Sequence, residues 1–201
     1  MKRGAISLAL FTVVAMDSMA LAQDNRESGT PPPAVRRMAP AEIRSEMLDR
    51  LFARLHTVAA DTEAAAIEQQ IWKIWLTSDS ATAQALMNQA ITAMSTQELD
   101  AALKILDGLV KVHPEFMEAW NRRATLYFMQ GNFEDSISDI AKVLEFEPRH
   151  FGALAGLGMI KERQGDSEAA LVAFRAALAV NPHMPGVIQA VKDIEKRFAP
   201  I

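Results

Sequence analysis

Apolar residues recur at three- and four-residue spacing along most of the chain after residue 39, and this spacing is typical of one face of an amphipathic helix. The first such stripe contains Ile43, Met47, Leu48, Leu51, Phe52 and Leu55. A second stripe begins after Asp61 and Thr62, which suit a helix N-terminus, and contains Ile67, Ile71, Trp72, Ile74 and Trp75. The small polar run from Thr77 to Ser80 then interrupts the pattern. Residues 40–82 are therefore predicted to form a helical pair.

The pattern after residue 82 repeats with a period of 34 residues. Met117–His150 and Phe151–Met184 align without a gap, and Ala83–Phe116 falls into the same register. Each of these three copies predicts two helices and closes on a proline, at Pro114, Pro148 and Pro182. Internal repeats of this length usually mean stacked supersecondary units. The chain is therefore predicted to be all-α, with its helix pairs stacked into a solenoid.

Two further segments flank the three clear copies. The same register places Asp49–Thr82 before the first copy, although this segment lacks the glycine, the small residue and the closing proline. We interpret residues 40–82 as a pair that includes a degenerate copy, or at least as a helical pair that stacks on the array. At the other end, residues 185–201 hold one more amphipathic helix, which begins at Pro185. The last unit of a solenoid needs a polar outer face, so this segment is predicted to be a capping helix.

Residues of similar size recur at the same places in each copy. Large side chains such as Trp120 and Phe174 lie near small residues that let two helix axes approach closely: Ala90, Ala102, Ala124, Ser136, Gly158 and Ala170. Gly131 and Gly165 stand where the first helix of a copy must end, a position that favours positive φ.

With these residues, the three copies (83–116, 117–150 and 151–184) resemble tetratricopeptide repeats. The resemblance implies antiparallel helix pairs that stack into a right-handed superhelical solenoid. Three positions depart from the family pattern: Gln89 and Arg123 stand where leucine is usual, and Lys161 replaces a tyrosine. At these positions we expect a looser interface, or one that uses the aliphatic stems of the long side chains.

The first residues indicate where the protein acts. Lys2 and Arg3 precede a short apolar run from Ala5 to Met16, and small residues follow at Ala20 and Ala22. This pattern is typical of a secretory signal peptide over residues 1–22, cleaved after Ala22. The alternative is an uncleaved membrane anchor, but the apolar run is shorter than the roughly 20 residues that span a bilayer. Residues 23–39 are polar and proline-rich, so we expect a disordered leader. The mature chain is therefore expected to be periplasmic and to lack a membrane span.

Composition narrows the chemistry. The net charge of −4 and the pI near 5.6 give no basic surface for nucleic acid, and the absence of cysteine excludes thiol nucleophiles and thiolate metal sites. His113, His150 and His183 lie near the ends of copies, where a shared metal site is conceivable and solvated loop histidines are the favoured interpretation. No spacing indicates catalytic residues, a cofactor or a metal. The chain is therefore not expected to be an enzyme.

The resemblance further implies a concave groove, lined by the first helices of successive copies, in which ligand peptides usually lie. The groove residues of this chain would be Met87, Ile91, Met94, Asn121, Thr125, Phe128, Ala155, Met159 and Glu162. Arrays that clamp a carboxylate present lysine, asparagine and arginine in this groove, whereas here Met87, Ile91 and Ala155 stand at those places and Arg122 is the only nearby cation. We therefore expect an apolar, methionine-rich groove for an apolar or amphipathic segment of a partner protein. The alternative is that Met87, Met94 and Phe128 are partly buried by neighbouring helices or by the leader.

These patterns together predict a non-catalytic protein–protein interaction module of the cell envelope. The alternative is an accessory subunit of an envelope enzyme complex, or a scaffold that self-associates through Trp72, Trp75 and the capping helix. The sequence indicates neither the identity of the partner nor an oligomeric state.

Overall fold

The computed structural model describes residues 39–198. Within that range the chain forms nine helices and no strand: α1 (Pro40–Thr57), α2 (Asp61–Trp75), α3 (Ala81–Ser95), α4 (Leu99–Val112), α5 (Met117–Met129), α6 (Phe133–Phe146), α7 (Phe151–Arg163), α8 (Ser167–Val180) and α9 (Pro185–Phe198). The prediction of an all-α solenoid is confirmed. The expected signal peptide (1–22) and all of the expected leader except Ala39 lie outside the described residues.

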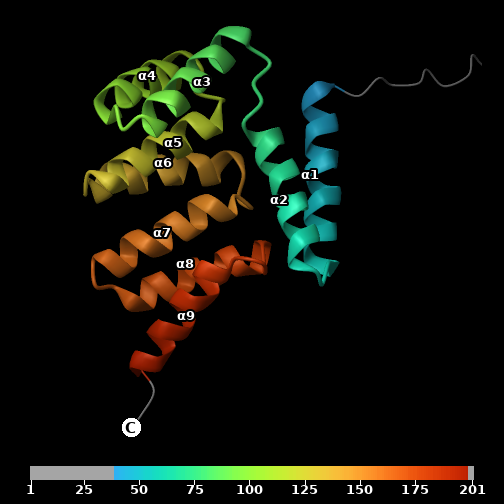
Figure 1. Ribbon diagram of the computed structural model, residues 1–201, viewed down its shortest axis with the longest axis vertical. Helices are drawn as coiled ribbons and strands as arrows, with labels where there is room; N and C mark the ends of the chain where they lie inside the picture. The colour runs from blue at the N-terminus through green and yellow to red at the C-terminus, as the bar shows by residue number, and fades with distance from the viewer. Residues whose placement is uncertain (1–38, 199–201) are drawn as a thin grey trace, which may run out of the picture. The chain divides into compact units, whose positions relative to one another are not determined.

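Each predicted copy corresponds to one pair of helices in a stack. The pairs α3–α4, α5–α6 and α7–α8 pack internally, α4 packs on α5, α6 on α7, and α9 on α8. Figure 1 shows these helices following one another along the stack. The buried side of α9 holds Val187 and Ile194, whereas Lys192, Lys196 and Arg197 are exposed.

The turn between the two helices of a copy has the same backbone geometry each time. Gly131 and Gly165 have φ of 75° and 80°, as the sequence predicts, and Gln97 holds the equivalent position of the first copy at φ 63°. The residue that follows each of them donates its N–H to a carbonyl five residues earlier, which closes the helix C-terminus. The first copy therefore makes the same turn without a glycine.

Small residues allow the close helix packing that the repeat pattern predicts. Ala102 and Ala170 are fully buried, and a Cβ added to Gly158 of α7 would lie 2.4 Å from a ring carbon of Phe174 in α8. The Ser136 hydroxyl donates a 2.7 Å hydrogen bond to the buried carbonyl of Ala124, so this small polar residue also has its partner. The aromatic ring of α8 thus occupies the space that a side chain at residue 158 would need.

Arg123 shows that the departure from the family pattern is compensated by a charge pair. Its guanidinium donates two 2.8 Å hydrogen bonds to Asp139 and a third, also 2.8 Å, to Asp107. The hydrogen bond to Asp139 raises the pKa of Arg123, so the guanidinium is charged at every ordinary pH. The expectation of a loose interface at Arg123 is therefore wrong, because specific polar contacts replace the usual leucine.

The helices α1 and α2 form a hairpin, which we call the strap, and it packs against the later copies. Its buried side chains share one cluster with Phe151 at the start of α7, and Met117, Val180 and Met184 pack against that cluster. Figure 1 shows α1 and α2 running lengthwise along one side of the stack. The 34-residue register did not indicate this arrangement, since a further copy would continue the stack beside α3.

Polar contacts hold the strap at several points along this edge. Arg149 donates to Asp49 of α1 at 2.6 Å, and the Asn181 amide donates to Glu68 of α2 at 2.8 Å. Trp75 is buried and Trp72 is half-buried, and both contact His150 and Phe151 of the same chain. Self-association through these two tryptophans is therefore not supported, because the array of the same molecule already covers them.

Between residues 39 and 198 no helix combines the length and the apolar character that crossing a membrane requires.

Candidate functional site

A cavity of about 330 Å³, which we call the groove cavity, opens between α5 and α7. On α5, Asn121, Thr125 and Phe128 face it at four- and three-residue spacing, which places them on one side of the helix. Its full lining consists of Asn121, Ala124, Thr125, Phe128, Met129, Ser136, Ile140, Gly152, Ala153, Ala155, Gly156, Met159 and Ile160. The cavity is therefore walled by three successive helices of the array.

Small residues make up much of the α7 wall of the cavity. Gly152, Ala155 and Gly156 line it at the spacing of one helix face. Larger apolar side chains stand at its rim, where Met129 and Met159 are 52% and 47% exposed and Phe128 is half-buried. Methionine is flexible and polarisable, so such a rim adapts to apolar groups of different shape.

The polar groups of the lining are largely engaged within the protein. The Thr125 hydroxyl donates to the Asn121 carbonyl at 3.0 Å, and the Asn121 amide nitrogen donates to the Glu118 carboxylate at 3.1 Å. The Arg163 guanidinium lies 5.8 Å from the centre of the Phe128 ring, within the range of a cation–π contact. The cavity therefore offers mainly apolar surface, with a cation at one edge.

Five of the predicted groove residues meet in this cavity: Asn121, Thr125, Phe128, Ala155 and Met159. Met87, Ile91 and Met94 lie on α3 and do not line it. Met87 is fully buried in the core formed by α3, α4 and α5, so its assignment as a groove residue is wrong. Met94 is half-buried against the same core, whereas Ile91 is 36% exposed.

The glycines that line this wall, Gly152 and Gly156, were not predicted to belong to the groove. The start of α7 reads FGALAGLG, and a glycine inside a helix costs about 1 kcal/mol relative to alanine. Three glycines within eight residues of one helix therefore indicate that the room left by neighbouring groups, rather than helix propensity, determines the residue type at these positions. Gly158 gives that space to Phe174 and Gly152 gives it to Trp72, whereas Gly156 lines the groove cavity.

A buried polar pair lies behind the cavity and was not expected. His150 and Glu118 are both fully buried, and the His150 Nε2 atom lies 2.8 Å from Glu118 Oε1. His150 Nδ1 accepts the backbone N–H of Ala153 at 3.0 Å, so the imidazole caps α7 and its Nε2–H donates to Glu118. The interpretation of His150 as a solvated loop residue is therefore wrong.

The other predicted metal candidates do not join His150. His113 pairs with Glu115 at 3.2 Å, and His183 lies 3.5 Å from Asp61. No group of three or more histidine and acidic residues in the described part of the chain could hold a metal ion. Arg122, the cation that the sequence placed near the groove, lies 3.5 Å from the Glu118 carboxylate and forms an ion pair with it.

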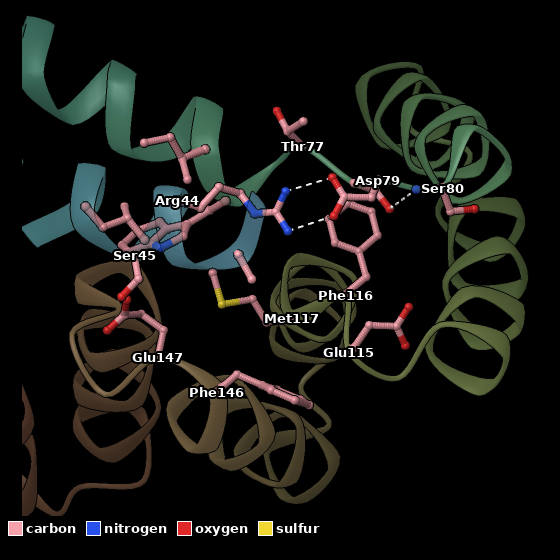
Figure 2. Close-up of a pocket in the computed structure, with 15 residues that line it drawn as sticks. Arg44, Ser45, Thr77, Asp79, Ser80, Glu115, Phe116, Met117, Phe146 and Glu147 are labelled. Atoms are coloured by element: carbon pink, nitrogen blue, oxygen red, sulfur yellow. Dashed lines mark hydrogen bonds and ion pairs between the residues drawn. The ribbon is translucent and has the colours of Figure 1, made fainter. Parts of the chain in front are cut away.

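A second hollow of about 360 Å³, the strap cleft, separates the N-terminal half of α1 from the start of α5 and the end of α6. Figure 2 shows Arg44 reaching toward Asp79, and Phe116, Met117 and Phe146 lie below this pair in the view. The two ion-pair distances from Arg44 to Asp79 are both 2.7 Å, and this hydrogen bonding lowers the pKa of Asp79. Arg44 and Asp79 thus pair with each other across the cleft, whereas Glu115 and Glu147 of its lining pair with His113 and Arg149.

Comparisons with known proteins agree with this geometry. Profiles of the tetratricopeptide repeat family match residues 87–150 and 151–184. A TPR repeat-containing protein of Rhizobium etli is 40% identical over 137 residues, which are 68% of this chain and 67% of that protein. Anaphase-promoting complex subunit 3 of Schizosaccharomyces pombe is 26% identical over 101 residues, half of this chain but only 15% of that subunit.

Solved structures show the same fold at low sequence identity. The first TPR domain of Spaghetti bound to an HSP90 peptide has a TM-score of 0.57 and 18% identity, and covers 61% of this chain and 97% of that one. The TPR2B domain of yeast Sti1 in complex with an Hsp70 peptide gives 0.54 and 18%, over 59% and 99%. MamA gives 0.55 and 15%, over 80% of this chain and 85% of that chain.

Proposed function

Because this chain belongs to the tetratricopeptide repeat family, we propose that it is a non-catalytic protein–protein interaction module whose groove cavity takes an apolar segment of a partner protein. The observation that carries the proposal is the pairing of small residues on the α7 wall, Gly152, Ala155 and Gly156, with a rim of half-buried Phe128 and exposed Met129 and Met159. One or two apolar side chains of a partner helix or strand fit a hollow of about 330 Å³. Related folds in Sti1 and Spaghetti are bound to peptides of Hsp70 and HSP90, which supports a peptide as the ligand class.

The cavity does not favour a carboxylate as the main anchor of this ligand. Arg122 is engaged with the buried Glu118, and Arg163 is held near the Phe128 ring. An apolar side chain that enters the cavity instead loses its contact with water, and this contributes about 25 cal/mol for each Å² buried. Affinity is thus expected to depend on the apolar residues of the partner.

We further propose that the protein acts in the periplasm after export. The motivation is the basic and apolar N-terminal pattern of residues 1–22. The mature protein recovered from a periplasmic fraction should then begin at Gln23. Recovery of the full-length chain from the membrane fraction would instead favour the anchor.

The groove is tested with the double variant Phe128→Asp and Met159→Asp, which places two charges at the rim of the cavity. Partners are captured from periplasmic extract with wild type, with this variant and with Val172→Asp. Val172 is 70% exposed on α8 and does not line the cavity, so it is a matched control for an added surface charge. The proposal expects that one captured protein is lost with the double variant and retained with the control. Retention by the double variant, with an unchanged helical circular dichroism signal, would overturn it.

A further inference from the structure

Two series of side-chain contacts connect the strap to the wall of the groove cavity. The first joins Trp72 of α2 to Gly152 of α7. A Cβ at Gly152 would lie 2.8 Å from Trp72 Cη2 and 3.1 Å from Trp72 Cζ2, so the indole fills the space of the missing side chain. Gly152 also lines the groove cavity. One residue therefore contacts the strap while it forms part of the proposed binding surface.

The second series of contacts passes through the buried pair of His150 and Glu118. Trp75 of α2 stacks on the His150 imidazole, with ring centroids 4.2 Å apart and planes inclined by 17°. His150 binds Glu118, and Glu118 accepts hydrogen bonds of 3.1 and 3.2 Å from the Asn121 amide, which belongs to the cavity lining. The orientation of the Asn121 amide is thus set by a carboxylate whose own partner lies against the strap.

The strap has its own attachment, which lies outside the cavity. Its apolar cluster includes Leu55, Ile71 and Phe151, and polar contacts from Asp49 and Glu68 reach the later turns. None of the residues of α1 or α2 lines the groove cavity. A solenoid copy normally contacts only its neighbours, so an element that contacts several copies restrains their relative movement. The contacts of the strap can therefore bias the cavity without forming part of it.

We propose that the strap is a regulatory brace: when docked, it holds Gly152 and Asn121 in the geometry that binds a partner, and when released, it weakens that binding. The part that concerns binding rests on the proposed function of the groove cavity. Release removes Trp72 from Gly152 and Trp75 from His150, which frees the first turn of α7 and the Asn121 amide. A coupling between two sites typically changes affinity about 5- to 150-fold, and a loss within this range is expected here.

The resonances of methionine methyl groups can show whether the strap affects the cavity, and this measurement needs no partner protein. Met129 and Met159 line the cavity, Met184 packs against the strap cluster, and Met94 packs in the distant core of α3 and α4. In protein labelled with ¹³C at the methionine methyls, Trp72→Ala should move the resonances of Met129, Met159 and Met184 and leave that of Met94 in place. Met47→Ala is the matched control, because Met47 is an exposed residue of the strap. It should move none of these four resonances.

The outcomes separate the brace from the proposed function. If Met184 moves while Met129 and Met159 keep their wild-type positions, the proposal is wrong. Trp72→Phe provides the same comparison if Trp72→Ala does not fold, because a smaller ring also withdraws from Gly152. For a partner identified through the groove cavity, equal affinity of wild type and the Trp72 variant overturns the regulatory role. Failure of the cavity to bind any protein refutes the proposed function, whereas the methyl resonances still decide whether the strap shapes the cavity.

Discussion

The imidazole of His150 donates to the carboxylate of Glu118 across 2.8 Å, in a place where neither side chain is exposed to solvent. The pair joins the start of α7 to the first turn of α5, two helices that belong to successive copies. Because the strap covers its outer side with Trp75, water cannot replace either partner. Removal of one partner leaves the other buried without its hydrogen bond. The cost of that unpaired group determines how much the pair contributes to stability.

We predict that Glu118→Ala lowers the free energy of unfolding by about 3–5 kcal/mol, as is typical when one partner of a buried pair is removed. Urea unfolding followed by circular dichroism measures the change. The exposed pair of His113 and Glu115, at 3.2 Å, is the matched control within the same chain. Glu115→Ala should change the unfolding free energy by no more than about 0.5 kcal/mol. Similar losses for both variants would mean that burial adds nothing to the His150 pair.

Gly158 and Gly108 should respond to alanine in opposite ways. A Cβ at Gly158 would lie 2.4 Å from the Phe174 ring, and the overpacking should cost about 1–3 kcal/mol. Nothing lies within 4 Å of a Cβ at Gly108 in α4. Alanine at this position should therefore raise the free energy of unfolding by about 0.5–1 kcal/mol, because alanine has the higher helix propensity. Thermal unfolding of the two variants gives the sign directly. A stable Gly158→Ala protein would show that Phe174 can shift without loss.

Arg123→Leu restores the residue that the family usually has at this position, yet we expect it to destabilise the protein by about 3–5 kcal/mol. The reason is that Asp139 is buried and would lose both hydrogen bonds from the guanidinium. Burial raises the pKa of Asp139, so a carboxylate without its arginine would tend to take up a proton. Urea denaturation at neutral pH measures the loss.

The double variant Arg123→Leu with Asp139→Leu tests the same explanation. Replacing both members of a buried pair with apolar residues is often neutral or stabilising. The double variant should therefore recover most of the stability lost in Arg123→Leu. If it is as unstable as the single variant, the packing of Arg123 rather than its charge pair carries the effect.

The ion pair between Arg44 and Asp79 should depend on pH. Hydrogen bonding from Arg44 lowers the pKa of Asp79 below its ordinary value of 3.8. A carboxyl group whose pKa is lower in the folded state contributes stability above its unfolded pKa and loses it as pH falls through the folded pKa. The contact should thus persist at neutral pH and be lost only below pH 3.8. The ¹³C resonance of the Asp79 carboxyl group should titrate below that value in wild type and return toward it in Arg44→Ala.

The repeat period made most of the array predictable. Gly131 and Gly165 turn at positive φ, and Ala102 and Ala170 are buried, because these local requirements recur in every copy. The strap was not predictable in the same way. Its side chains pack on Phe151, about 75 to 100 residues further along, and an apolar stripe does not specify which surface covers it.

The residues of the candidate site were likewise predictable only where the repeat pattern determines their position. Asn121, Phe128 and Met159 could be assigned from their place within a copy, since the first helix of each copy presents the same face. The assignment of Met87 was wrong because its large apolar side chain is buried in the core of α3, α4 and α5, whereas the equivalent residues Asn121 and Ala155 line the cavity. The burial of His150 was not predicted because Trp72 and Trp75 of the strap, which lie outside its own copy, pack on its imidazole.

The strap also has a consequence for the order in which the chain folds. Its polar contacts with Arg149 and Asn181 span 100 and 113 residues, whereas the pairs of the array close over short turns. Contacts of long range form slowly, because a large loop must close before they can be made. Helices α1 and α2 leave the ribosome before any surface that they cover has been synthesised. The first helices of the chain are therefore expected to be the last to reach their native contacts, after the array has formed.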